Sequence, residues 1–210
     1  MTDNFLECEF YMIPIMKAKK LYVPGSIVMA TINNLPVHKL SGGNHTSDNT
    51  YILDLPEFKQ MKEWFEKQLN SYVHDVLCIN KKVHVYITQS WIVFNPKGTY
   101  HSYHLHGNSL ISGIYYLQGD VTPVRFIREV KDGVFGLIIL PFDKLNKYNI
   151  SELRSENTKH SLTLFPSNVL HSVGENENDE TRISLSFNTF FSGSIGEDKS
   201  LTRLDLKEED

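Results

Sequence analysis

The chain has 210 residues, of which 40% are hydrophobic and 22% are charged, and its formal net charge is -4. This length fits one large domain or two small ones, and the interspersed charges argue against a general nucleic-acid surface. The only two cysteines, Cys8 and Cys78, form no Cys-x-x-Cys pair, so a reducing cytoplasm is expected. Residues 1–4 lack the character of a signal peptide, and no apolar run is long enough to span a membrane.

The first 40 residues are expected to form short strands and turns. Two extended runs are predicted, Phe5 to Met16 and Leu21 to Ile32, and Pro24-Gly25 interrupts the second one. Residues 41–50 are polar and rich in Gly, Ser and Asn, which indicates a loop that could cover a site as a lid.

A helix is predicted over residues 56–76, with Asp54 as its N-cap and Glu57 three residues later. Its apolar residues recur at helical spacing, at Phe58, Met61, Phe65, Leu69, Tyr72 and Val76. Such a stripe is typical of a helix that packs across a sheet, so residues 1–80 are expected to form an N-terminal α/β extension.

From residue 82 onward, short β-rich runs alternate with turn signals, among them Asp132-Gly133, which is typical of a hairpin. This pattern predicts a mainly β fold with a flanking helix, either a double-sheet jelly roll or a barrel. The polar segment 142–160 contains one weakly helical piece and is expected to be a flap or crossover. A single domain is expected, with a β core over 82–191 and a tail over 192–210. The predicted strands lie near residues 82–95, 100–106, 111–118, 123–129, 134–140, 161–165, 169–173 and 181–191.

Three histidines are candidate metal ligands. His104 and His106 are two residues apart, so their side chains share one face of an extended strand. His171 ends another apolar run and could complete the site, since a local pair plus one remote ligand is usual in catalytic metal sites. The role of His101 stays open, and Ser102, Asn108 or Ser172 could orient a ligand through its second ring nitrogen. A lone histidine is more often structural, so the pair by itself is weak evidence.

A second candidate feature is the strand that begins at Arg182. Arg182, Ser184, Ser186 and Asn188 alternate with apolar residues, so one face carries a guanidinium and hydroxyls. A merely solvated strand would show the same alternation. A hairpin through residues 176–179 would bring this strand beside His171, where Arg182 and Ser184 could bind a carboxylate.

These motifs resemble the 2-oxoglutarate/Fe(II)-dependent oxygenases of marine bacteria and cyanophages. The similarity lies in the His-x-His-x-x-Ser-x-x-Ser-Gly-x-Tyr-Tyr run from His104 to Tyr116, in Phe165-Pro166 with Leu170 to Val173, and in Arg182 to Asn188. It covers roughly residues 82–206, and its last part, from Thr189 to Leu206, is similar to phage members.

The resemblance implies a double-stranded β-helix with His104 and His171 as metal ligands. It also implies that Arg182 and Ser184 hold the distal carboxylate of 2-oxoglutarate and that the cofactors are Fe(II) and 2-oxoglutarate. The wider superfamily usually has Asp or Glu where this chain has His106, so the third ligand is in question. Three imidazoles would leave the metal with one more unit of positive charge, although a three-imidazole iron site is chemically reasonable.

The implied reaction is the oxidation of a C–H bond, usually a hydroxylation, coupled to the decarboxylation of 2-oxoglutarate. Tyr115 or Tyr116 could contact the cosubstrate, with Tyr116 taken as the candidate, whereas Trp91 and Phe94 are expected to be packing residues. Two alternatives remain: a cupin-like three-His dioxygenase that does not use 2-oxoglutarate, and a jelly-roll protein without activity. The substrate, a small molecule or a peptide, is not specified, and a homo-oligomer is compatible with the sequence.

Overall fold

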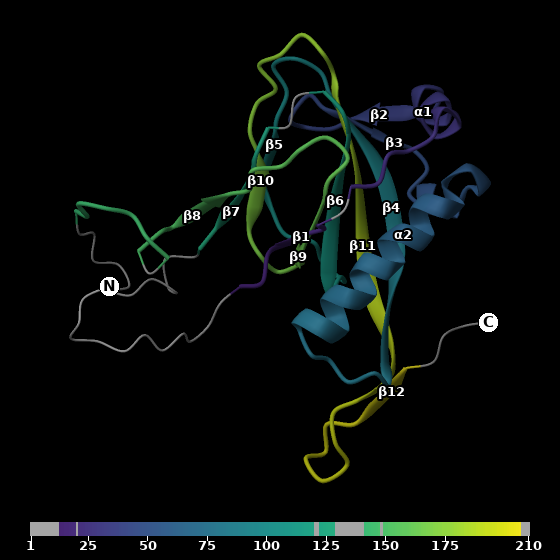
Figure 1. The fold of residues 1–210 in the computed structure, drawn as a ribbon, viewed down its shortest axis with the longest axis vertical. Helices are drawn as coiled ribbons and strands as arrows, with labels where there is room; N and C mark the ends of the chain where they lie inside the picture. The colour runs from purple at the N-terminus through teal and green to yellow at the C-terminus, as the bar shows by residue number, and fades with distance from the viewer. Residues whose placement is uncertain (1–12, 20, 120–121, 129–140, 148, 207–210) are drawn as a thin grey trace.

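A computed structural model describes residues 13–19, 21–119, 122–128, 141–147 and 149–206 (Figure 1). Its described part contains an eight-stranded sheet in the order β1-β9-β6-β11-β4-β3-β2, with β12 paired to β11, and a four-stranded sheet in the order β5-β10-β7-β8. The strands are β1 (Met16–Lys17), β2 (Val37–Lys39), β3 (His45–Ser47), β4 (Val83–Asn95), β5 (His101–His104), β6 (Ile111–Gln118), β7 (Val124–Ile127), β8 (Glu152–Arg154), β9 (Leu162–Pro166), β10 (His171–Val173), β11 (Arg182–Ile195) and β12 (Leu204–Leu206).

The strand β11 is central to the large sheet, because it pairs antiparallel with β4 along one edge and with β6 along the other. Its odd-numbered residues Ile183, Leu185 and Phe187 are buried in the core beneath the helices. Arg182, Ser184 and Ser186, which alternate with them, line a cavity between the two sheets. The mainly β jelly-roll fold with a flanking helix that the sequence predicts is therefore confirmed, and its strand periodicity sets which side chains enter the cavity.

The helix predicted over 56–76 is present in three segments. A 3₁₀ turn (η2, Pro56–Phe58) leads into α2 (Lys59–Ser71), and a π-helical turn (η3, Tyr72–Val76) ends it. The helix covers the outer face of the large sheet (Figure 1). There Phe65 stacks on Phe187 at a ring-centroid distance of 5.3 Å. Gly113 of β6 leaves room for that contact, because a Cβ at this position would collide with the ring of Phe187.

Asp54 is not the N-cap of this helix, which corrects the prediction. It ends a separate 3₁₀ turn (η1, Ile52–Asp54), and its carboxylate lies 2.8 Å from the ammonium group of Lys62. The helix instead begins without a side-chain cap, behind Pro56, whose fixed φ suits the first turn. Packing of the apolar stripe therefore stabilises the start of the helix more than capping does.

Two predictions for the N-terminal region are wrong. The run from Leu21 to Ile32 was expected to be extended, but α1 (Ser26–Asn33) begins directly after Pro24-Gly25. Val28 and Ile32, four residues apart, are buried in the helical core, so tertiary packing overrides the β-branched composition of this segment. The polar stretch 41–50 is not a free loop, since it contains β3, and β3 pairs with β4.

Further predictions concern the C-terminal half. In the described part of 142–160 the weak helical piece is absent and β8 is present, paired with β7. The strand predicted at 134–140 and the turn Asp132-Gly133 lie outside the described residues. The strand β11 continues to Ile195, beyond the predicted limit, because β12 pairs with its end. Along the described ranges, no helix is both long and apolar enough to cross a membrane.

Candidate metal and anion site

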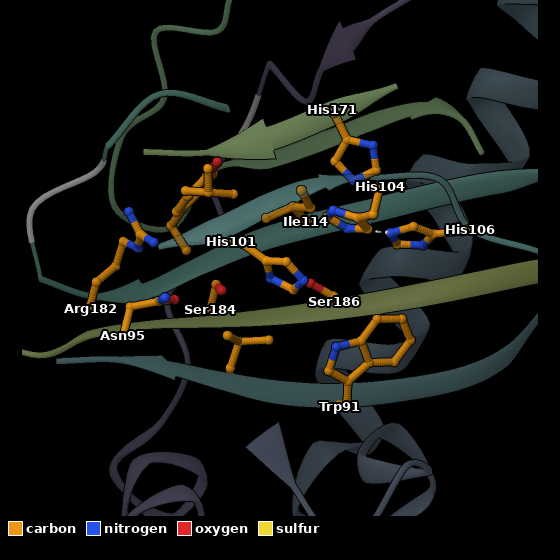
Figure 2. Close-up of a pocket in the computed structure, with 13 residues that line it drawn as sticks. Trp91, Asn95, His101, His104, His106, Ile114, His171, Arg182, Ser184 and Ser186 are labelled. Carbon is orange, nitrogen blue, oxygen red and sulfur yellow. Dashed lines mark hydrogen bonds between the residues drawn. The ribbon is translucent and has the colours of Figure 1, made fainter. Parts of the chain in front are cut away.

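Three histidines converge at one end of the cavity between the sheets (Figure 2). His104 ends β5 and lies directly opposite His171, the first residue of β10. His106 follows two residues later, before a turn in which Asn108 adopts a positive φ of 54°. One nitrogen from each ring lies within 4.8 Å of the others, and the Nε2 atoms of His104 and His106 are 3.3 Å apart.

Hydrogen bonds fix the tautomer of each ring. Nδ1 of His104 donates to the Ser102 carbonyl at 2.8 Å, and Nδ1 of His171 donates to the Val169 carbonyl at 2.9 Å. Nδ1 of His106 donates to Oδ1 of Asn188 at 2.5 Å. Because these oxygens can only accept, each Nδ1 carries the hydrogen and each Nε2 presents its lone pair.

The converging lone pairs fit a cation. Two imidazole nitrogens bound about 2.1 Å from one metal ion are separated by about 3.0–3.4 Å in octahedral or tetrahedral geometry. The 3.3 Å between the Nε2 atoms of His104 and His106 matches that separation. Without a cation these lone pairs would repel each other, so the donor set suits a divalent transition metal.

Burial keeps these imidazoles neutral, which is the form that binds a metal. Desolvation, aided by the neighbouring His104, lowers the pKa of His171 to about 3. Desolvation also lowers the pKa values of His104 and His106. The pKa of His101 falls to about 4, first through burial and then through the electrostatic influence of His104, His106 and the guanidinium of Arg182.

The other end of the cavity carries a buried cation. Arg182, the first residue of β11, has only 2% of its surface exposed and lies opposite Asn95 of β4. Ser184 lines the same wall, and Figure 2 shows both residues at the end of the cavity away from Trp91. The described residues that line this cavity include no carboxylate. Its wall is therefore positive and suits an anion.

The route by which Arg182 reaches the site differs from the predicted hairpin. The strands β10 and β11 belong to different sheets, so Arg182 and His171 face each other across the cavity instead of pairing side by side. The connection between them is anchored by Asn176, which is buried and donates to the carbonyls of Asn95 and Glu180.

The aromatic residues near the motifs separate into two environments. Tyr116 lines the cavity and accepts a hydrogen bond from Asn157, whereas Tyr115 packs against Phe65 in the helical core. Trp91 was expected to be a packing residue, but it lines the cavity with its ring centroid 5.9 Å from that of His106. Its register explains this position, because Trp91 is the cross-strand partner of Ser186 on the cavity face.

The structure also places residues that the sequence left undecided or did not single out. His101 lines the cavity and stacks on His104 at a centroid distance of 4.3 Å. Ser102 contributes through its carbonyl and not through its hydroxyl. Asn188 and Ser112 contact Nδ1 of His106, although neither was predicted to orient a ligand. Their alternation with core residues was visible in the sequence, but their contact with a residue as distant as His106 was not.

Comparisons with known proteins agree with this geometry. A family model described as "Putative 2OG-Fe(II) oxygenase" matches residues 89–188, the stretch that contains all three histidines and Arg182. No curated protein matches the chain.

The fold is shared with several solved structures, three of which are described here. A Pseudomonas putida prolyl-4-hydroxylase is 15% identical, with 84% of this chain and 92% of that chain covered and a TM-score of 0.52. HygX from Streptomyces hygroscopicus, with nickel and 2-oxoglutarate bound, is 10% identical over 84% and 82% of the chains, with a TM-score of 0.57. The viral collagen prolyl hydroxylase vCPH from Paramecium Bursaria Chlorella virus-1, a 2OG complex, is 10% identical over 83% and 94%, with a TM-score of 0.53.

At these identities the solved structures establish the fold alone. The family match adds the motifs, since it spans both ends of the cavity. The jelly-roll fold, the three-histidine cluster and the match over residues 89–188 are each similar to features of the 2OG-Fe(II) oxygenases.

Proposed function

We propose that the protein is an oxygenase that uses Fe(II) and 2-oxoglutarate to oxidise a C–H bond of its substrate, with hydroxylation as the outcome. The observation that carries the proposal is the pairing, in one cavity, of three Nε2 lone pairs with a buried Arg182. These two ends match the needs of a cosubstrate that binds a metal at one end and presents a free carboxylate at the other.

Each residue has a distinct role in this proposal. His104, His106 and His171 hold the metal and are kept neutral by burial. Arg182 and Ser184 hold the distal carboxylate of 2-oxoglutarate. Tyr116 forms part of the wall beside the cosubstrate.

When bound, the metal supplies the activation of O₂, and one oxygen atom goes to succinate while the other goes to the substrate. Decarboxylation of 2-oxoglutarate releases CO₂ and provides the two electrons that, with the C–H bond, complete the reduction of O₂. The protein contributes neutral ligands, a positive anchor for the cosubstrate and a cavity lined by residues of both sheets.

The substrate is proposed to approach on the side of Trp91. The cavity end with Arg182 is reserved for the cosubstrate, whereas Trp91 lies beside His106 and offers an apolar wall. A small molecule or a peptide, and not a nucleic acid, is proposed on the basis of the net charge of -4. The two cysteines suit a reaction in a reducing cytoplasm, and an origin in marine bacteria or cyanophages is proposed from the sequence resemblance alone.

A second candidate function is supported by His106 itself, because a three-histidine site is also compatible with a metal-dependent dioxygenase of cupin type that does not use 2-oxoglutarate. Arg182 discriminates between the two candidates. In the oxygenase that we propose, its substitution greatly weakens cosubstrate binding, whereas the cupin-type enzyme has no need of it.

Substrate-independent turnover tests the proposal. The iron-loaded protein is supplied with 2-oxoglutarate, O₂ and ascorbate, and succinate is quantified against a His171→Ala variant. Succinate above the level of the variant is the expected result. A protein that binds iron but neither binds nor turns over 2-oxoglutarate would refute the proposal and favour the cupin-type alternative.

A further inference from the structure

The three histidine ligands differ in how they are oriented. His104 and His171 each donate from Nδ1 to a backbone carbonyl two residues earlier in their own segment, Ser102 and Val169. Such contacts depend on local backbone geometry and tolerate changes of sequence. His106 is different, because its Nδ1 contacts two side chains, Asn188 of β11 and Ser112 of β6.

A group of buried and half-buried polar side chains surrounds this contact. Ser112 and Asn188 are cross-strand partners, and the Ser112 hydroxyl donates to Oδ1 of Asn188 at 3.3 Å. The same hydroxyl lies 2.8 Å from that of Ser167, which in turn donates to the hydroxyl of Ser109 at 2.7 Å. Ser112 and Ser167 are buried, so water does not compete strongly for these bonds.

The backbone of His106 is tied to the same group, because its amide donates to the Ser167 carbonyl at 3.1 Å. Both the main chain and the ring of His106 are therefore anchored by residues from other strands. An amide oxygen cannot donate a hydrogen bond, so its contact selects the Nδ1–H tautomer and leaves the Nε2 lone pair toward the cavity.

We propose that Asn188 is a positioning residue that makes His106 a metal ligand. This inference rests on the proposed function and extends it to a residue that touches no metal, cosubstrate or substrate. The ring nitrogen opposite the metal in such sites needs an acceptor that fixes the ring and raises its basicity. Asn188 provides that acceptor through Oδ1, and Ser112 holds the amide in place.

The neutral amide also sets the charge of the site. The ligand at position 106 is an imidazole, so no ligand of the cluster carries a negative charge. A carboxylate at position 188 would accept the same hydrogen bond and add a negative charge behind the ring. It would thereby increase the basicity of His106 and attract the metal more strongly. Substitutions at Asn188 therefore separate loss of orientation from change of charge.

Titration of the full-length metal-free protein with Co(II) tests the inference, because the visible d–d bands of Co(II) report ligand geometry without any turnover. Asn188→Leu keeps the size of the side chain but removes the acceptor, and it is expected to weaken Co(II) binding by about 10–100-fold and to shift the bands. Asn188→Asp is expected to bind Co(II) at least as tightly as the wild type, with shifted bands. Gln89→Leu is the matched control, since Gln89 is the exposed partner of Asn188 on β4 and is expected to leave affinity and bands unchanged.

The outcomes separate this inference from the proposed function. Wild-type affinity and an unchanged spectrum in Asn188→Leu would overturn the positioning role and leave the metal site intact. A wild-type protein that binds no Co(II) would overturn the metal site, and the positioning role with it. If Asn188→Leu does not fold, as judged by circular dichroism, Asn188→Asp decides. Retained binding with shifted bands supports the role, whereas lost binding or an unchanged spectrum refutes it.

Discussion

Replacement of Arg182 by leucine is expected to weaken cosubstrate binding at least about 150-fold while leaving metal binding intact. Only 2% of the surface of Arg182 is exposed, so bonds between its guanidinium and a carboxylate would be shielded from water. A hydrogen bond to a charged group contributes about 1.5–3 kcal/mol, and a forked guanidinium–carboxylate contact makes two of them. The lower limit of about 3 kcal/mol corresponds to a loss of affinity of about 150-fold.

Isothermal titration of the Ni(II)-loaded protein with 2-oxoglutarate measures this loss directly, because nickel excludes turnover. Arg203→Leu is the control, since Arg203 is an exposed arginine that pairs with Asp198 and Asp205 and does not line the cavity. It is expected to leave the affinity for 2-oxoglutarate unchanged. An Arg182→Leu variant that binds 2-oxoglutarate as tightly as this control would refute the assignment of the anion end.

Three further results are expected. Burial lowers the pKa of His171 to about 3 and that of His101 to about 4, so below their ordinary value of 6.5 the unfolded chain binds protons that the folded chain excludes. Urea denaturation of the metal-free protein should therefore show at least about 2 kcal/mol less stability at pH 5 than at pH 7.5, the contribution of His171 alone. Equal stability at both pH values would contradict this. Phe65→Ala should cost about 3–5 kcal/mol in the same assay because Phe65 is fully buried, whereas the exposed Glu66→Ala should change stability by about 0.5 kcal/mol or less. Co(II) should quench the fluorescence of Trp91, which lies beside His106. Quenching should therefore persist in the Trp64→Phe variant and disappear in the Trp91→Phe variant. The reverse pattern would place the metal elsewhere.

The features that the sequence predicted well are those with a strong local period. The apolar stripe of α2 and the alternation along β11 each determine which face is buried, and both faces are as expected. The segment that became α1 was mispredicted because its β-branched residues favour a strand locally. Its helical form depends on burial of Val28 and Ile32 against distant residues, which no local pattern records.

In the site, too, the features with a local sequence pattern are predictable, whereas contacts between distant residues are not. The pair His104 and His106 is visible as a two-residue repeat, and the contact of His171 with the pair follows from pairing of β10 with β5. The acceptor of His106 was missed because Asn188 is 82 residues away and reaches it only through the pairing of β11 with β6. From the sequence, Trp91 is predicted to be a packing residue. However, Trp91, Val93 and Asn95 alternate along β4, and this two-residue spacing places all three on the cavity face.

The central claim, that the three histidines and Arg182 bind Fe(II) and 2-oxoglutarate in one cavity, is tested most directly by an anaerobic titration. The metal-free protein receives Fe(II) and then 2-oxoglutarate, and the visible metal-to-ligand charge-transfer band is followed. We predict a band in the wild type that is lost in His171→Ala and lost or much weakened in Arg182→Ala. Iron binding without a band would contradict the assignment of the cosubstrate, and the absence of iron binding would contradict the metal site itself.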